Sequence, residues 1–515
     1  MKKVLLSLAI GVLVAIGLMS VIKGVPGAVW KFQQGYDTSV GSPFESSGST
    51  ARYVLVQAII EDKRFDLTEE KAHVSSPDIA LFEGKYLTIF APGVSFLGLP
   101  LYLLGRTIGL PQFMTYLLNP LVSLINVFLI ALLARRLGAG TLASYLGGLI
   151  YLFATNALTY ALTFTQHQIA ACIITSAILV ALSKKRALSD FFVGFLFATG
   201  VMMDIPNIFL LTPVVLFALS QHIKVQTEKS VYSVRLNFIA LVMLLGTLLP
   251  LGLFAYYNHA LTGSYLSAPQ FLGRHVIGGE KSNVIESTVE VAQPVQEEQN
   301  ASSGFKIPFQ TRAQLQSGYI LLFSKQRAWW YYSPVILLGV VGIWIALKEK
   351  KTQTAGVLTL ATVLINLTTY SLFWDPWGGW SFGARYLIPA AGLMGAFLAV
   401  AISRLSKNIF FSALFAVLLV YSVWVSTLGA LTTAAIPPKG EAEALADPIP
   451  YTYEYNQDLL EENKTNSLLY YLVFANSLSA QQYHIFLTAA FSVVLFAMYL
   501  MTIELKLRLP GRQKK

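Results

Sequence analysis

The feature that most constrains this chain is a series of long apolar runs separated by short clusters of lysine and arginine. Residues 113–133 and 409–428, for example, contain no charged side chain. A helix of ~20 apolar residues is what crosses the hydrocarbon core of a bilayer. Across 515 residues only 12% are charged and 55% are hydrophobic, which is too little charge to cover a soluble surface. We therefore expect an integral membrane protein, and its single cysteine, Cys172, excludes an intramolecular disulfide.

The basic clusters predict how the chain threads the membrane. The formal net charge is +10, which in a soluble domain would suggest nucleic acid. Here the positive residues fall at the ends of apolar runs, where they act as orientation signals, so no nucleic-acid partner is expected. Placing Lys2 and Lys3 in the cytoplasm predicts about twelve transmembrane helices, an uncleaved first helix and both termini inside. The predicted spans are residues 1–24, 113–133, 141–161, 168–182, 191–203, 208–219, 238–257, 334–347, 357–373, 387–402, 409–428 and 485–503.

The predicted fold is an all-α polytopic membrane protein with juxtamembrane helices in a large first extracytoplasmic loop, residues 25–112. In this loop STARYVLVQAIIED has apolar residues at helical spacing, which predicts an interfacial helix capped by Ser49 or Thr50. The apolar segment 92–104 is expected to stay on the same side as a juxtamembrane or re-entrant helix. The acidic, glutamine-rich stretch 275–305 predicts a mobile outer loop. We expect a core over residues 1–435, then an outer loop, the last span and a basic cytoplasmic tail over residues 436–515.

Polar residues that could carry chemistry gather at the outer ends of the predicted helices. Ionisable groups near membrane depth cost a few kcal/mol unless they face a partner or a wet cavity. The polar residues at these outer helix ends are His167, Asp204, Asn258, Arg327, Asp375 and Arg385, and all but Asn258 are ionisable. A carboxylate, a histidine and several arginines on one face favour a site for an anionic substrate, because arginine pairs bidentately with phosphate.

The stretch WDPWGGWSFGARYLIP, residues 374–389, lies between two predicted spans on that face. Tryptophans alone would form an interfacial belt. A belt does not require the glycines or an embedded Arg385, however. Glycines let backbone approach a ligand closely, and indole faces stack on sugar rings or pack against isoprenoid chains. We therefore expect Trp377 and Trp380 to contact sugar or lipid in a binding cavity.

Several stretches resemble integral-membrane glycosyltransferases of the GT-C superfamily, which contains protein O-mannosyltransferases and aminoarabinose transferases, and in detail a bacterial branch of it. They are RYVLVQAII, DIALFEGKYLTIFAPGVSFLGLPLY, TQHQIAA, MMDIP, YYNHALTGS, SGYILLFSKQRAWWYYSPVILL and WGGWSFGARYLIP, spread over most of residues 45–395. The resemblance implies a polyprenyl-phosphate-linked sugar donor and inverting transfer to a protein, lipid or glycan acceptor outside the bacterial cytoplasmic (inner) membrane. An acid in the first outer loop would act as base, and basic residues would hold the phosphate.

Carrying the resemblance over gives a set of expected site residues. The expected base is Asp78, then Glu45, then Asp37, with Asp204 as a second acid. The expected donor and phosphate contacts are Arg385, Arg327, Arg52 and His167. Further sugar or lipid contacts are expected from Tyr53 and Asn258. Related enzymes carry acids where this chain has Ser49 and Thr50, and a lysine near the place of Phe90.

Two other functions stay open at this stage. A flippase for lipid-linked intermediates would also handle polyprenyl phosphates, although we find no inverted repeat of the transporter type. A scaffold derived from a GT-C enzyme would explain the departures at Ser49, Thr50 and Phe90. The sequence shows no metal motif and no cofactor is expected, although an acid-bound divalent cation is left open.

Overall fold

The computed structural model of the chain describes residues 2–24, 40–183, 186–228, 231–236, 241–277, 313–373 and 375–508. Within these ranges, seven helices are long and apolar enough to cross a membrane, and five more apolar helices are shorter. Together they match the predicted spans one for one, so the expectation of an all-α polytopic membrane protein is confirmed. They are α1 (Lys2–Val21), α6 (Leu118–Arg136), α7 (Thr141–Phe153), α9 (His167–Ala181), α10 (Arg186–Met203), α11 (Asn207–Ser220), α12 (Leu241–Thr262), α16 (Gly339–Lys348), α17 (Gln353–Ser371), α18 (Ile388–Leu405), α19 (Ile409–Leu431) and α22 (Ala480–Arg508).

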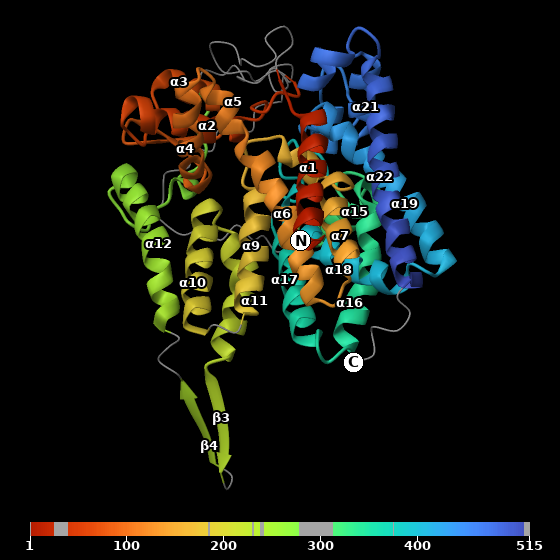
Figure 1. Cartoon of the computed structure of the whole chain (residues 1–515). Coiled ribbons are helices and arrows are strands. Elements are labelled where there is room, and N and C mark those ends of the chain that lie inside the picture. The colour runs from red at the N-terminus through yellow and green to blue at the C-terminus, as the bar shows by residue number, and fades with distance from the viewer. Residues whose placement is uncertain are drawn as a thin grey trace.

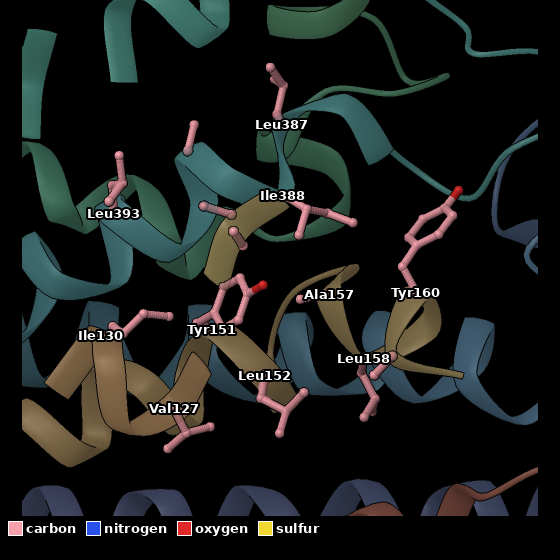
Figure 2. Packing of buried hydrophobic residues seen from close by; sticks show 14 of the residues in the cluster. Val127, Ile130, Tyr151, Leu152, Ala157, Leu158, Tyr160, Leu387, Ile388 and Leu393 are labelled. Atoms are coloured by element: carbon pink, nitrogen blue, oxygen red, sulfur yellow. The ribbon is translucent and has the colours of Figure 1, made fainter. Parts of the chain in front are cut away.

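Helix α18 forms the centre of the bundle. Its apolar window is 89% buried, against 33% for the window in α1, which faces outward. It packs on α6, α7, α9 and α16. The contact with α7 is close because Gly147 carries no side chain, and a Cβ there would meet the carbonyl oxygen of Gly395 at 2.4 Å. Figure 2 shows the apolar side chains at this centre, with Ile130, Tyr151 and Ile388 filling the space between the helices.

The first outer loop forms a compact layer at one end of the bundle (Figure 1). It contains α2 (Ser47–Gln57), α3 (Glu69–Ser75), the hairpin of β1 (Ile79–Phe82) and β2 (Lys85–Thr88), α4 (Gly93–Thr107) and α5 (Pro111–Tyr116). In the hairpin, Ile79 is opposite Thr88 and Phe82 is opposite Lys85. Segment 92–104 lies within α4 and packs on α2 and α5, as a helix of this layer rather than a span of the bundle.

Helix α2 differs from the interfacial helix that we expected. Its cap is Ser46, whose hydroxyl accepts from the Ser49 backbone N–H at 3.2 Å, so Ser49 and Thr50 lie inside the helix. Nearly every residue from Ser47 to Val56 is buried, including Arg52. The helix therefore has no face exposed to water, because α3, α4 and β2 pack on it and Gln166, just before α9, bonds to Arg52.

The remaining elements connect the spans. The strands β3 (Ile223–Glu228) and β4 (Val231–Leu236) pair as an antiparallel hairpin that projects from the end of the bundle opposite the first outer loop (Figure 1). Further short helices are α8 (Ala157–Ala161), α14 (Ala313–Leu322), α15 (Trp329–Tyr332), α20 (Lys439–Glu443) and α21 (Glu454–Glu461). The expected mobile loop 275–305 falls almost entirely outside the described residues, and the domain division at residue 435 stays a prediction.

Candidate active site

Arg52 is the centre of a polar cluster beneath the first outer loop. It is 4% exposed, and its guanidinium carbon lies 3.9 Å from the centre of the Phe90 ring, the geometry of a cation–π contact. One Nη donates to the carbonyl of Gly48 at 2.8 Å. The Nε is buried and has no hydrogen-bond partner in the part of the chain that the structure describes. Arg52 thus holds a positive charge at the site with donor capacity left over.

Gln166 connects Arg52 to the carboxylate of Asp204. Its Oε1 accepts from an Arg52 Nη at 2.6 Å, and its Nε2 donates to Asp204 Oδ2 at 3.2 Å. Asp204 lies in the turn between α10 and α11 and is partly exposed. An amide can accept from a cation and donate to an anion at the same time. It therefore aligns the two charges without closing a direct ion pair.

Arg385 completes the cluster from the loop between α17 and α18. This loop is shaped by Asp375, whose Oδ1 and Oδ2 accept from the backbone N–H groups of Gly378 and Gly379, each at 3.0 Å. Both glycines have positive φ, +70° and +64°, a conformation that other residues rarely adopt. A Cβ on Gly378 would lie 2.7 Å from Arg385 Nε. The absence of a side chain at Gly378 therefore leaves the space that the Arg385 guanidinium occupies.

Arg327 stabilises the same loop by donating hydrogen bonds to its backbone. Its guanidinium donates to the carbonyls of Trp377 at 3.1 Å, Gly379 at 3.3 Å and Ile436 at 3.0 Å. It is fully buried, and another donor goes to its neighbour Gln326 at 2.8 Å. The expected phosphate contact is thus committed to backbone carbonyls. We assign Arg327 to loop support.

Aromatic side chains surround the Arg385 guanidinium. The ring of Tyr386 lies 5.4 Å from it and stacks on Tyr370 with centroids 4.4 Å apart and planes 3° apart. His167 packs edge-on against Tyr386 at 6.1 Å. Arg385 Nε has no hydrogen-bond partner among the described residues, although it is buried. The aromatic rings pack around the cation, and its Nε is left to donate to a ligand.

The charges of the cluster act on each other. Burial raises the pKa of Asp204 above its ordinary value, and the positive charge of Arg52, the Gln166 amide and Arg385 oppose this shift. Burial lowers the pKa of Arg52 to about 10, with Asp204 opposing the shift and Arg385 adding to it. Arg52 stays protonated at neutral pH. One carboxylate between two arginines leaves an excess of positive charge, which suits an anion such as phosphate.

Asp78, the first expected base, lies next to this cluster but is already engaged. Its Oδ2 accepts from the Ser47 hydroxyl at 2.6 Å, and its Oδ1 lies 3.1 Å from an Nη of Arg274. Its charge still acts on Arg52. Both oxygens of Asp78 are thus occupied, whereas Asp204 Oδ1 has no hydrogen bond within the described residues and is open to an acceptor hydroxyl.

Glu45 joins two parts of the outer layer. Its carboxylate accepts from the backbone N–H groups of Gly41 at 2.6 Å and Ala434 at 2.7 Å, and from the Thr433 hydroxyl at 2.5 Å. It is 3% exposed. This geometry indicates a structural clamp. Asp37, the third expected base, lies outside the described residues.

The remaining expected contacts lie around the cluster. Trp377 donates to Gln326 Oε1 at 2.8 Å and Trp380 to Glu441 Oε2 at 2.6 Å, so both indoles bind neighbouring outer segments. Tyr53 packs in the outer layer, 4.8 Å from Phe44 between ring centroids. Asn258 donates to the Tyr265 carbonyl at 3.4 Å near the end of α12. The structure brings together Arg52, His167, Asp204 and Arg385 of the expected set.

Gln166 and the Tyr370–Tyr386 pair were not expected from the sequence. The signal for Gln166 was its position beside His167 in TFTQHQ, a polar group at the start of an apolar run. Tyrosines near a membrane surface are common, so nothing in the pattern distinguished these two. In the part of the chain that the structure describes, no three His, Cys, Asp or Glu residues come together to hold a metal ion.

An apolar groove of about 810 Å³ lies between α11 and α17, and none of the cluster residues lines it. The end toward the cluster is at Thr212, eight residues after Asp204, and at Thr368, two residues before Tyr370. Its far end is at Phe217 and Gln353. At 1.5 Å per helical residue, the groove extends roughly 22 Å along α17. It could hold an extended lipid chain with its head at the cluster.

The chain is similar to solved structures of two membrane glycosyltransferases. The Archaeoglobus fulgidus oligosaccharyltransferase in the apo form matches with a TM-score of 0.44 at 13% identity, over 88% of this chain and 59% of that one. ArnT from Cupriavidus metallidurans bound to undecaprenyl phosphate matches with a TM-score of 0.44 at 12% identity, over 98% of this chain and 78% of that one. In the apo state ArnT matches at 0.46 and 13% identity.

This chain spans only 59% of the length of the oligosaccharyltransferase. No protein-family model matches the sequence, and no curated protein matches it significantly. The roles of individual residues therefore rest on the geometry of this chain.

Proposed function

We propose that the protein is a glycosyltransferase that moves a sugar from a polyprenyl-phosphate donor to an acceptor. One observation carries the proposal. The Asp204 carboxylate is linked through Gln166 to Arg52 and lies within electrostatic reach of Arg385, and each guanidinium has an Nε without a hydrogen-bond partner among the described residues. An apolar groove runs between α11 and α17, the two helices that lead away from Asp204 and Tyr370. A negatively charged head on a long apolar tail matches that arrangement. The site would lie on the extracytoplasmic face of a bacterial inner membrane, with both termini inside.

The proposed reaction is a single inverting displacement. Asp204 takes the proton of the acceptor hydroxyl, whose oxygen attacks the anomeric carbon of the donor. The bond from that carbon to the phosphate oxygen breaks, and the polyprenyl phosphate leaves with the electron pair. Arg385 and Arg52 stabilise the charge that develops on the leaving phosphate. Because attack and departure occur on opposite faces, the anomeric configuration inverts.

The division of roles among the acids follows from their hydrogen bonds. Asp204 has a carboxylate oxygen without a partner within the described residues, whereas Asp78 and Glu45 have both oxygens engaged. We therefore propose Asp204 as the base. Asp78 would act on Arg52 only through its negative charge, without a direct contact.

The test uses the full chain in lipid nanodiscs with a panel of polyprenyl-phosphate sugars. Transfer to added acceptors and release of polyprenyl phosphate are measured for the wild type, Asp204→Asn and Arg385→Ala, with thermal unfolding to show that the variants fold. Turnover by the wild type that the two folded variants lack would support the proposal. Unchanged turnover in both variants would remove these residues from the site.

A second candidate function, a flippase, can be distinguished with the same purified protein. The groove could also carry a lipid-linked intermediate across the membrane, as in a flippase. Proteoliposomes with a fluorescent polyprenyl-phosphate sugar report movement between leaflets. Movement without transfer would replace the glycosyltransferase proposal with that of a flippase, and neither activity would favour a scaffold.

A further inference from the structure

A second basic site lies at the opposite membrane face from the candidate active site. Helix α6 begins beside the active cluster, where Asn119 donates to the carbonyl of Thr165 at 2.8 Å, one residue before Gln166. It then descends through its 19 residues, roughly 27 Å, to Arg135 and Arg136. Helix α9 also starts at the active cluster and runs in the same direction. Both helices therefore end at the far face.

A hollow of about 380 Å³ opens between these two ends. Leu132, Arg135 and Arg136 of α6 and Leu179 of α9 line it. Leu132 is 49% exposed on the outside of the bundle, where lipid would contact it. Two leucines and two guanidinium groups thus face one space at the level where hydrocarbon gives way to headgroups.

The arginines in this hollow have donors to spare. Arg135 makes one hydrogen bond, from Nη to the Thr141 hydroxyl at 3.2 Å. Arg136 is exposed, and among the described residues neither arginine pairs with a carboxylate. By contrast, Arg404 on the same face is paired with Glu349 at 2.5 Å. Cations at a helix C-terminus are stabilised by the helix dipole, but that stabilisation needs no hollow.

We propose that this hollow binds the phosphate headgroup of an anionic phospholipid from the leaflet opposite the active site. Arg135 and Arg136 would donate to the phosphate oxygens, for which the guanidinium has matching geometry. One acyl chain would lie along Leu132 and Leu179. Charge complementarity and the apolar walls together select a lipid rather than a free anion, because free phosphate gains nothing from the leucines.

The experiment measures lipid bound to the full chain by native mass spectrometry after exchange into mixed phosphatidylglycerol and phosphatidylcholine. The wild type should retain phosphatidylglycerol preferentially. The double variant Arg135→Ala/Arg136→Ala should lower that retention at least tenfold, because even one charged hydrogen bond to the phosphate contributes about a factor of ten. Inorganic phosphate added in excess should not displace the lipid.

A matched control removes the same charge from the same face. Lys350 and Lys351 are exposed in the turn between α16 and α17. This turn lies close to the end of α6, since a Cβ on Gly138 would be 3.2 Å from Thr352. Lys350→Ala/Lys351→Ala should leave lipid retention within about twofold of wild type, because neither lysine lines the hollow and exposed charges farther away are screened by salt. Equal losses in both double variants would overturn the proposal, since a general basic surface would then explain the binding.

A second variant keeps the charge and fills the space. Leu179→Trp closes the hollow without touching the arginines, and it should lower phosphatidylglycerol retention while thermal unfolding stays near wild type. It keeps the test valid if the arginine variant does not fold. Full retention in a folded Leu179→Trp protein, or displacement by inorganic phosphate, would contradict a lipid site here.

Discussion

The side-chain amide of Gln166 donates to Asp204 Oδ2 at 3.2 Å while its own carbonyl accepts from Arg52 at 2.6 Å. A direct Arg52–Asp204 pair would tie up both the cation and the base. The Gln166 amide bridges Arg52 and Asp204 and fixes their relative position. It leaves one Asp204 oxygen and the Arg52 Nε without a hydrogen-bond partner among the described residues. The central geometry of the site therefore depends on a neutral residue.

Gln166→Glu should slow transfer about 10- to 100-fold without removing it. A glutamate still accepts from Arg52, but it cannot donate to Asp204 and adds a second negative charge beside it, which raises the pKa of the Asp204 carboxyl further. The measurement is the pH dependence of kcat/KM, whose acid limb should move to higher pH. Gln166→Leu serves as the control, because it removes both hydrogen bonds and adds no charge. An unmoved limb in Gln166→Glu would contradict the assigned role.

The acid limb of the wild-type pH profile of kcat/KM tests whether Asp204 is the base. Burial raises the pKa of Asp204, and only the deprotonated carboxylate accepts a proton. Activity should therefore fall as the pH drops through the raised pKa, at a higher pH than an ordinary aspartate would give. Asp204→Asn should lower kcat/KM by about 10²–10⁴ and abolish that limb. Asp78→Asn should keep it. A limb that survives in Asp204→Asn but disappears in Asp78→Asn would exchange the two roles.

Gly378→Ala should displace Arg385. The added Cβ would meet Arg385 Nε at 2.7 Å, so the guanidinium must shift, and donor KM should rise about tenfold for one weakened charged hydrogen bond. Gly379→Ala is the matched control. Its φ is also positive, +64°, but nothing lies within 4 Å of a Cβ there. Both variants should lose similar stability, and equal KM values for the two would show that the contact with Arg385 has no influence on donor binding.

Ala361→Trp should distinguish donors by the length of their lipid chains. Ala361 lies midway along the α11–α17 groove, and an indole there blocks an extended chain but leaves the charged head of the groove unchanged. KM should rise at least tenfold for a long polyprenyl donor and stay near wild type for a short-chain analogue. Leu248→Trp, on the exposed side of α12, controls for an added tryptophan facing lipid. The same loss with both donor lengths would place the lipid chain elsewhere.

Glu45→Gln should destabilise the outer layer rather than the reaction. The Glu45 carboxylate accepts three hydrogen bonds, from residues 41, 433 and 434. Losing that charge should cost about 1.5–3 kcal/mol of unfolding free energy, the range for a buried hydrogen bond to a charged group. Thermal unfolding measures this, and the pH profile of the remaining folded enzyme should be unchanged. A stable but inactive Glu45→Gln would return Glu45 to the list of bases.

The sequence by itself determined the membrane class, the spans and the face on which the polar residues gather. Hydrocarbon requires every backbone group to be paired within the segment, so each uncharged run had to be a helix. The basic clusters between the runs supplied the predicted threading. His167, Asp204 and Arg385 were found in the same way, because ionisable groups at helix ends near the membrane are costly without a purpose.

Only the tertiary structure decided which of these residues meet. Arg327 and Arg385 are alike in the sequence, but packing commits the first to four backbone carbonyls and leaves the second with an open donor. Asp78 and Asp204 differ in the same way, since Ser47 and Arg274 engage one and a single amide engages the other. Hydropathy depends on each residue's own side chain, whereas hydrogen-bond saturation depends on neighbours from tens to more than 100 positions away along the chain, as Asp204 and Arg52 are from Gln166. That dependence is the physical reason the spans could be predicted and the base could not.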